Sequence, residues 1–126
     1  MNRRIFGLGI GLILLPLLVN AAPVTSATWA DGHSATVTDE ELLRYAIRSP
    51  AAGYPEEAQR RKLTGNGVYE LRIARNGQTT QVTVIRTAGN EVLDRAAKSA
   101  FMKWKLKPGV FTRITIPVSW SVNPVH

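Results

Sequence analysis

Near the end of the chain, residues 113–122 carry apolar side chains at every second position. Successive side chains of a β-strand point to opposite faces, so this pattern predicts a strand with one buried face and one solvated face. The apolar face consists of Ile114, Ile116, Val118, Trp120 and Val122, and the other face, polar except for Pro117, consists of Arg113, Thr115, Pro117, Ser119 and Ser121. Such a strand needs neighbouring strands and a second layer that covers its apolar face.

Earlier segments supply that sheet and that layer. Residues 67–73 alternate in the same way, and the Asn76-Gly77 pair predicts a two-residue hairpin turn with positive φ at both residues. The return strand is expected over residues 79–86. Apolar residues then recur at helical spacing, which predicts an amphipathic helix packed on the sheet. Its stripe consists of Leu93, Ala96, Ala97, Ala100, Phe101 and Trp104, with the two aromatic residues expected in the core.

A short helix is expected just before the hairpin. Pro55 suits the first helical position because its φ is fixed near the helical value, and Gly65 can supply the left-handed residue that ends the helix. Tyr54 stands at the helix entry, as a structural anchor or as a partner contact. The order helix, strand, strand, helix, strand predicts an α+β domain over residues 51–126, with a small three-stranded antiparallel sheet and a helix packed on one face.

The region before this domain divides into two parts. Residues 1–22 have Arg3-Arg4, an apolar run and a pair of alanines, which is the layout of a signal peptide or of a short signal anchor through residues 5–22. Residues 23–50 are expected to be a linker, unstructured over 23–37 and with a short helix at about 38–47, where Thr38 and Glu41 form a capping box. The domain is therefore expected to be exported across the inner membrane.

Side chains for catalysis or metal binding are scarce. Both histidines, His33 and His126, lie outside the predicted domain, the chain contains no cysteine, and the sequence has no phosphate-binding loop or metal-ligand spacing. Asp94 is expected to pair with Lys98 one helical turn away. We predict no catalytic, cofactor or metal site and no enzyme activity. The chain has a net charge of +7, but the export signal argues against nucleic acid as a binding partner. The basic residues are suited to solvated helix ends, or to binding anionic lipid or an acidic receptor surface.

The ordered set of segments resembles the C-terminal domain of the TonB energy-transducer family. The resemblance runs over about 70 residues and is carried by Tyr54-Pro55, Ala58, Gly65, Gly67, Asn76-Gly77, Leu93-Asp94, Ala96-Ala97, Trp104, Pro108-Gly109 and residues 114–118. It implies a domain that captures a short extended segment, the TonB box, from an outer-membrane receptor. It also implies that inner-membrane motor proteins energise the transducer, and it places the segment around Tyr54 and Pro55 next to the partner site.

The chain departs from that family pattern in two places. Typical transducers carry a Ser and His pair in the membrane helix, and residues 1–22 contain neither residue type. The long Pro-rich spacer is also missing, since residues 23–50 reach at most about 100 Å when extended. Three hypotheses remain: a periplasmic domain that docks a receptor or another exported protein, a minimal membrane-anchored transducer coupled to a motor, and a structural envelope-associated module.

Pro117 indicates where a partner would dock. A proline lacks the N–H that a strand directs to its neighbour, so it is tolerated where that direction meets an open edge. We therefore expect the strand over residues 112–122 to be an edge that receives an extended peptide, unless Pro117 simply protects that edge from aggregation. The predicted partner-binding residues are Tyr54, Pro55, Arg113, Thr115, Pro117, Ser119 and Ser121.

Overall fold

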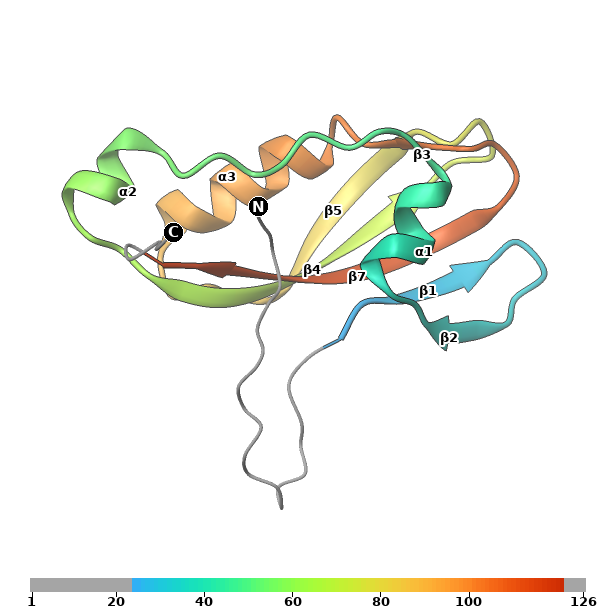
Figure 1. Ribbon diagram of the computed structural model, residues 1–126, viewed down its shortest axis with the longest axis horizontal. Helices are drawn as coiled ribbons and strands as arrows, with labels where there is room; N and C mark the ends of the chain where they lie inside the picture. The colour runs from blue at the N-terminus through green and yellow to red at the C-terminus, as the bar shows by residue number, and fades with distance from the viewer. Residues whose placement is uncertain (1–23, 122–126) are drawn as a thin grey trace, which may run out of the picture.

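The computed structural model describes residues 24–121, which form one α+β unit. In chain order the elements are β1 (Ser26–Trp29), β2 (Ser34–Thr36), α1 (Asp39–Arg44), β3 (Ala46–Arg48), α2 (Glu56–Arg60), β4 (Gly65–Ile73), β5 (Thr79–Arg86), α3 (Glu91–Phe101), β6 (Lys105–Leu106) and β7 (Phe111–Trp120). Five strands form an antiparallel sheet in the order β2-β1-β7-β4-β5 (Figure 1), and β3 and β6 form a separate two-stranded sheet.

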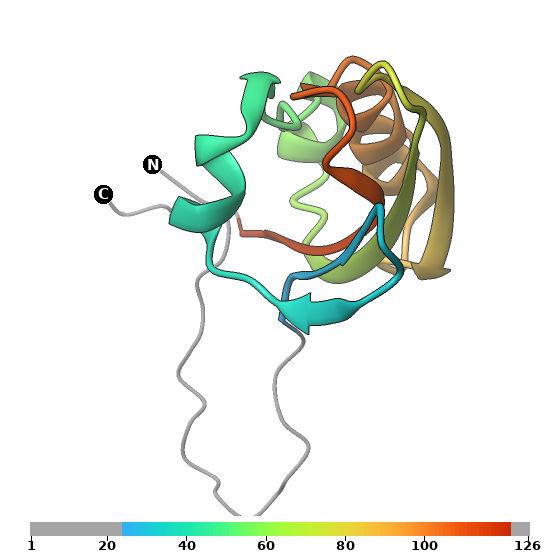
Figure 2. The same cartoon turned by 90° about the vertical axis from the view of Figure 1, so that its right-hand side faces the viewer.

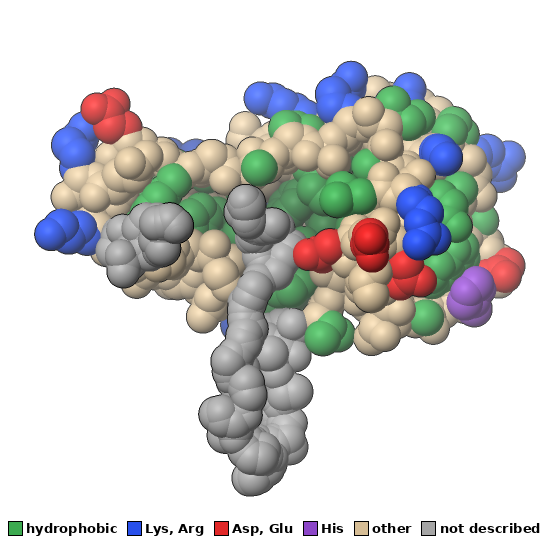
Figure 3. All heavy atoms as spheres, in the orientation of Figure 1, with side chains coloured by type: hydrophobic (Ala, Val, Ile, Leu, Met, Phe, Trp, Pro, Cys, Tyr) green, Lys and Arg blue, Asp and Glu red, His purple; other side chains and the backbone are tan. Residues whose placement is uncertain are grey.

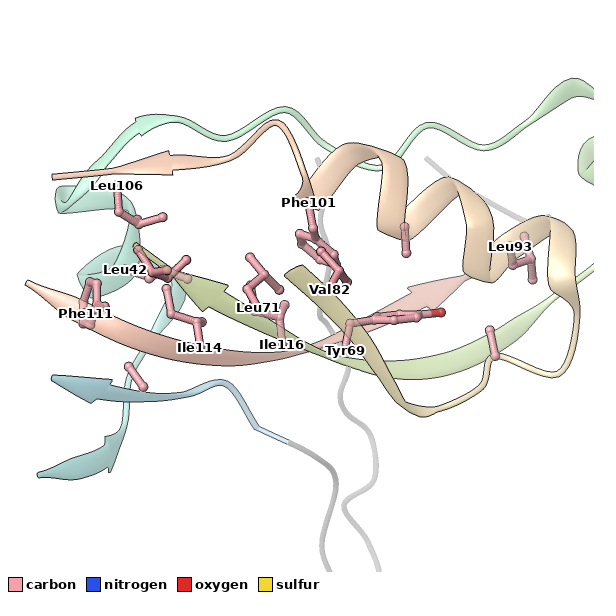
Figure 4. Close-up of a cluster of buried hydrophobic side chains, with 14 of the residues drawn as sticks. Leu42, Tyr69, Leu71, Val82, Leu93, Phe101, Leu106, Phe111, Ile114 and Ile116 are labelled. Atoms are coloured by element: carbon pink, nitrogen blue, oxygen red, sulfur yellow. The ribbon is translucent and has the colours of Figure 1, made fainter. Parts of the chain in front are cut away.

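The core lies on one side of this curved sheet, where helix α3 covers the β4–β5 part (Figure 2). Leu42 of α1 and Leu106 of β6 belong to the same buried cluster. Figure 4 shows Leu93 and Phe101 of α3 on the same side of the sheet as Tyr69 and Leu71 of β4. The largest fully buried side chains are Tyr69, Leu71, Leu93, Leu106 and Ile114. Phe101 is buried as predicted, whereas Trp104 is half-buried and its indole N–H donates to the carbonyl oxygen of Pro50 at 2.9 Å.

The α+β class and the predicted hairpin, long helix and last strand are confirmed, but the predicted three-stranded sheet is wrong. The expected strands are β4, β5 and β7, and the sheet also contains β1 and β2. Residues 26–36 were expected to be unstructured, and they form the β1–β2 hairpin, which pairs with β7. The fold therefore begins well before residue 51, and His33 lies on the folded unit.

Both hairpins of the large sheet are closed by the same kind of loop. The Ala74 N–H donates to Gln78 O and the Gly77 N–H donates to Ala74 O, each at 2.8 Å. This is a three-residue loop with a turn followed by a left-handed glycine, so the predicted two-residue turn is wrong. Gly77 has φ of +93°, whereas Asn76 is not among the described residues with positive φ. The Asn76 side chain instead accepts the Gln78 N–H at 3.0 Å.

The β1–β2 loop repeats that arrangement with an aspartate in place of the asparagine. The Trp29 N–H donates to His33 O and the Gly32 N–H donates to Trp29 O, both at 2.9 Å. The Asp31 carboxylate accepts the His33 N–H at 3.0 Å, and Gly32 has φ of +98°. The Asp31-Gly32 pair is a hairpin signal of the same type as Asn76-Gly77, and it gives this segment a local reason to fold.

The two short helices differ from their expected limits. The capping box of Thr38 and Glu41 is confirmed, but α1 ends at Arg44 because the next residues form β3, which pairs with β6. Pro55 is the N-cap of α2 rather than its first helical residue. The left-handed residue after α2 is Lys62, with φ of +54°, and not Gly65, which begins β4. No helix within residues 24–121 has the length and apolar composition needed to cross a membrane, and the predicted signal segment 1–22 lies outside the described residues.

Candidate functional site: a docking edge on strand β7

Strand β7 has different neighbours along its two sides. On one side β4 pairs with it from Arg72↔Arg113 to Gly65↔Trp120. On the other side β1 pairs with it from Trp29↔Phe111 to Ser26↔Thr115 and then ends. Within the described residues, no strand of the sheet covers that second side beyond Thr115. The prediction that residues 112–122 form an edge strand is therefore wrong for residues 112–115, whereas residues 116–120 do lie at an edge of the sheet.

The hydrogen bonds of β1 show which residues of β7 direct their backbone N–H and C=O groups away from β4. Thr25 and Trp29 bond to the β2 side, because Thr25 O accepts the Val37 N–H at 3.0 Å and the Trp29 N–H donates to His33 O at 2.9 Å. Successive residues of a strand alternate between neighbours, so Ser26 and Thr28 bond to Thr115 and Arg113 of β7.

The same alternation places Pro117 at the open part of the edge. Pro117 and Ser119 share parity with Arg113 and Thr115, so their backbone groups point away from β4. Beyond Thr115 this direction is no longer covered by β1. The missing N–H of Pro117 thus falls on the side where no ladder partner is required, which agrees with the parity that the sequence predicted.

The polar face of β7 has its own contacts with β4. Glu70 lies between Arg72 and Arg113, at 3.9 and 3.7 Å, and its side chain is 20% exposed. The Ser119 hydroxyl lies 2.7 Å from the Asn66 side-chain oxygen. The apolar face of the same segment is anchored in the core through Ile116 and Trp120, while Val118 is half-buried. The open segment is therefore held in place by its pairing with β4 and by its side chains in the core.

The predicted partner-binding residues fall into three groups in space. Arg113 and Thr115 lie where β1 already pairs with β7. Pro117 and Ser119 lie on the uncovered half, with Ser121 directly after the strand. Tyr54 and Pro55 precede α2, and Figure 1 shows the C-terminal half of β7 running toward the end of the molecule that holds α2, whereas β1 lies toward the other end.

Tyr54, which lies just before α2, forms hydrogen bonds with one residue in that helix and one residue after it. Its hydroxyl donates to Leu63 O, and its carbonyl accepts the Gln59 side-chain amide at 2.7 Å. Desolvation raises the pKa of the Tyr54 phenol. Figure 3 shows hydrophobic side chains gathered in a hollow at the centre of this face of the molecule, between the α2 end and the α1 end. An extended segment on the open half of β7 would lie toward the α2 end of that face.

Asp94 has a role that the sequence did not indicate. The carboxylate accepts hydrogen bonds from the Tyr69 hydroxyl at 2.6 Å, from the Ala88 N–H at 2.9 Å and from the Thr87 hydroxyl. Desolvation raises the pKa of Asp94, but these hydrogen bonds and the Lys98 charge outweigh it and hold the pKa below its usual value. Burial, followed by the Asp94 contact, raises the pKa of Tyr69. This network ties β4 to α3.

The residues that the sequence interpretation missed are those of β1. Thr25 and Ala27 are buried and alternate with the half-exposed Ser26 and Thr28, a short period-two pattern that ends at the Asp31-Gly32 loop. Small side chains give a weak hydrophobic signal, so the sequence of β1 is hard to distinguish from that of a flexible linker. Within residues 24–121 no group of three or more His, Asp or Glu residues is placed to hold a metal ion.

Comparison with known proteins agrees with this fold. Residues 50–123, more than half of the chain, match the family model described as the Gram-negative bacterial TonB protein C-terminal. The chain is similar to protein TonB of Xanthomonas campestris pv. campestris (strain B100), with 32% identity over 76 residues that cover 56% of this chain and 34% of that protein. It is also similar to protein TonB of Vibrio cholerae serotype O1, with 28% identity over 76 residues that cover 56% of this chain and 31% of that protein.

A solved structure shows the same fold. The solution structure of the Pseudomonas aeruginosa TonB C-terminal domain matches with a TM-score of 0.52 and 20% identity, over 64% of this chain and 86% of that one. The chain spans about a third of the length of the two TonB relatives. With its last strand, hairpin and long helix arranged in this way, the chain belongs to the TonB C-terminal domain family.

Proposed function

We propose that the chain is an exported, periplasmic TonB-type binding domain that supports TonB-dependent transport across the envelope. Its partner is an extended segment of an outer-membrane receptor or of another exported protein, which adds as a strand to β7. The observation that supports this proposal is the half-covered side of β7, where β1 pairs as far as Thr115 and the strand continues to Trp120.

Strand addition suits this site for a physical reason. The backbone of β7 is already fixed by its pairing with β4 from Arg113 to Trp120. Only the partner strand must therefore lose conformational freedom when the new ladder forms. β1 illustrates the geometry, since it is itself an antiparallel strand added to this side of β7. Pro117 has no N–H to donate, so the ladder between β7 and the partner lacks one hydrogen bond. This favours a partner whose backbone carbonyl opposite Pro117 can remain exposed to solvent.

The experiment is an amide-shift titration of the full exported chain. The probes are short peptides copied from the periplasmic N-terminal segments of outer-membrane receptors of the same cell, with scrambled peptides as controls. We expect the largest shifts at Ser119, whose backbone N–H points away from β4, and at the adjacent Ser121. Shifts confined to the β4–β5 hairpin or to α3 would exclude the β7 edge as the docking site.

A membrane-anchored transducer coupled to inner-membrane motor proteins is a second candidate function. The apolar run of residues 5–19 behind Arg3-Arg4 favours it, because an uncleaved segment would hold the domain at the inner membrane. The N-terminal residue of the mature protein decides between the two. A start near Ala22 or Pro23 removes the transducer, and an intact Met1 in the membrane fraction supports it.

A further inference from the structure

We infer that the β1–β2 hairpin is an intramolecular occupant of the docking edge, and that a partner strand which binds along the whole of β7 displaces Ser26–Trp29. The inference rests on the proposed docking at β7. It adds to that proposal a competitor within the same chain and a register for the partner.

The position of β1 supports the first part of the inference. β1 bonds to the side of β7 that faces away from β4, which is the same side that stays open from Ile116 to Trp120. A partner strand that starts on the open half and extends toward Phe111 therefore meets β1 at Thr115. The partner then has two options. It pairs only with the part of β7 after Thr115, or it replaces β1 and pairs with the rest of β7 as well.

The contacts of the hairpin are few enough for displacement. Its register along β7 covers only four positions and shifts between Thr28 and Trp29. The outer strand β2 is exposed at all three residues. Of the side chains that β1 directs to the core, Ala27 is buried at 2% exposure but is small. Trp29 is half-buried against Phe111, with ring centroids 5.2 Å apart.

The hairpin competes because it is tethered. A strand in the same chain has an effective concentration of order millimolar for a short flexible connection, so an external strand must overcome it. Displacement leaves the rest of the fold in place, because β7 keeps its ladder with β4 and its core contacts through Ile114 and Ile116. The hairpin thus raises the affinity threshold that a partner must reach.

The register of β1 also describes the partner that could replace it. Ala27 lies opposite Ile114 and fits only a small side chain, because it is almost completely enclosed. Ser26 and Thr28 lie opposite Thr115 and Arg113 on the solvated face, where polar residues are suited. The partner is therefore an extended peptide segment with a small apolar residue between two polar ones.

The first test uses a peptide of residues 24–30, added to the full chain carrying Ala27→Glu or Ala35→Glu. The two alanines lie opposite each other in the hairpin, but only Ala27 is buried against the core. We expect Ala27→Glu to release β1 and to increase affinity for the peptide at least about tenfold over the wild type, and Ala35→Glu to leave it unchanged. Equal affinities for all three proteins would overturn the inference.

A second test does not depend on how well Ala27→Glu folds. The chain has no cysteine, so a Ser26→Cys/Thr115→Cys pair links β1 to β7 and a Thr28→Cys/Ser34→Cys pair closes the hairpin alone. We expect the oxidised first variant to bind the peptide at least about tenfold more weakly than its reduced form, because the tethered strand can no longer leave. The second variant should bind equally in both forms, and a loss there, or none in the first, contradicts displacement.

The two proposals fail in different ways. If receptor peptides shift Ser119 and Ser121 while neither hairpin variant changes peptide affinity, the docking edge stands and the competing hairpin is excluded. If no peptide binds β7 in any variant, the docking edge itself is wrong.

Discussion

The β1–β2 and β4–β5 hairpins are closed by nearly identical loops and are attached to the molecule very differently. Each loop has an Asx side chain that accepts a backbone N–H two residues later and a glycine with positive φ after it. The β4–β5 hairpin brings Tyr69, Leu71 and Ile73 into the core, whereas β1–β2 brings Ala27 and part of Trp29. Loop chemistry therefore decides that a hairpin forms, and side-chain size decides how firmly it is attached to the core.

The largest expected effect tests the firmly attached hairpin. Leu71 is completely buried in β4, so Leu71→Ala should destabilise the domain by about 2 to 5 kcal/mol through lost burial and a residual cavity. Urea denaturation of the full chain measures the change. Leu43→Ala is the control, because Leu43 is 54% exposed, and it should change stability by less than about 0.5 kcal/mol. Similar losses for the two variants would contradict the assigned core.

Substitutions at the two loop glycines distinguish the effect of backbone strain from the effect of steric crowding. Gly77→Ala and Gly32→Ala both introduce a side chain at positive φ, but a Cβ at Gly77 would lie 1.9 Å from Leu106 O, whereas a Cβ at Gly32 would meet nothing within 4 Å. We expect Gly77→Ala to destabilise the domain by well over ~1 kcal/mol and Gly32→Ala by about 1 kcal/mol or less. Thermal unfolding measures both, and equal losses would show that only φ matters.

The pH dependence of stability should follow Asp94. Its folded-state pKa is depressed, so its contribution is present above the ordinary carboxylate pKa and is lost as the pH falls through the lower, folded value. Asp94→Asn should reduce stability by about 1 to 3 kcal/mol at neutral pH, because it weakens the bonds to the buried Tyr69 hydroxyl and the Ala88 N–H.

Urea midpoints measured from neutral to acidic pH provide the comparison for Asp94. The difference between the wild type and Asp94→Asn should begin to shrink below about pH 4, where the carboxylate of the unfolded chain becomes protonated. It should be lost once the pH falls through the lower pKa of the folded state. Asp31→Asn is the control in the β1–β2 loop. The pKa of Asp31 is also lowered, through the His33 backbone and side-chain hydrogen bonds, but the residue is fully exposed. A constant difference for Asp94→Asn at all pH values would exclude the carboxylate as the cause.

The smallest effect on global stability is expected at the loosely attached hairpin. Trp29 stacks on His33 at 4.5 Å and packs on Phe111 at 5.2 Å. Trp29→Ala should therefore increase amide exchange in β1 and at Arg113 and Thr115, and it should lower the global free energy of unfolding by only about 1 kcal/mol. Hydrogen exchange read residue by residue checks this. Uniformly faster exchange across β4 and β7 would instead make the β1–β2 hairpin part of the cooperative core.

Much of the fold follows from local pattern. Alternation in residues 67–73 and 112–120, the helical stripe of α3 and the capping box of Thr38 each predicted the element that the structure contains. These features depend on side-chain size and spacing within one segment, and a single sequence contains them. The β1–β2 hairpin was missed because Ser, Ala and Thr alternate with little contrast in hydrophobicity, although Asp31-Gly32 provided a local turn signal.

The candidate site depended more on tertiary structure. The position of Pro117 indicates which side of β7 can lack a neighbouring strand. The alternation of side chains in the sequence is enough to show which residues point their backbone groups to that side. Whether the side is open is a question of which distant segment pairs with it. β1 lies more than 80 residues before β7 in the chain and covers positions 111–115, so Arg113 and Thr115 are paired while Pro117 and Ser119 lie past the end of β1. Strand pairing is set by long-range backbone hydrogen bonds and the small Ala27 contact with the core, and neither leaves a strong mark in the sequence.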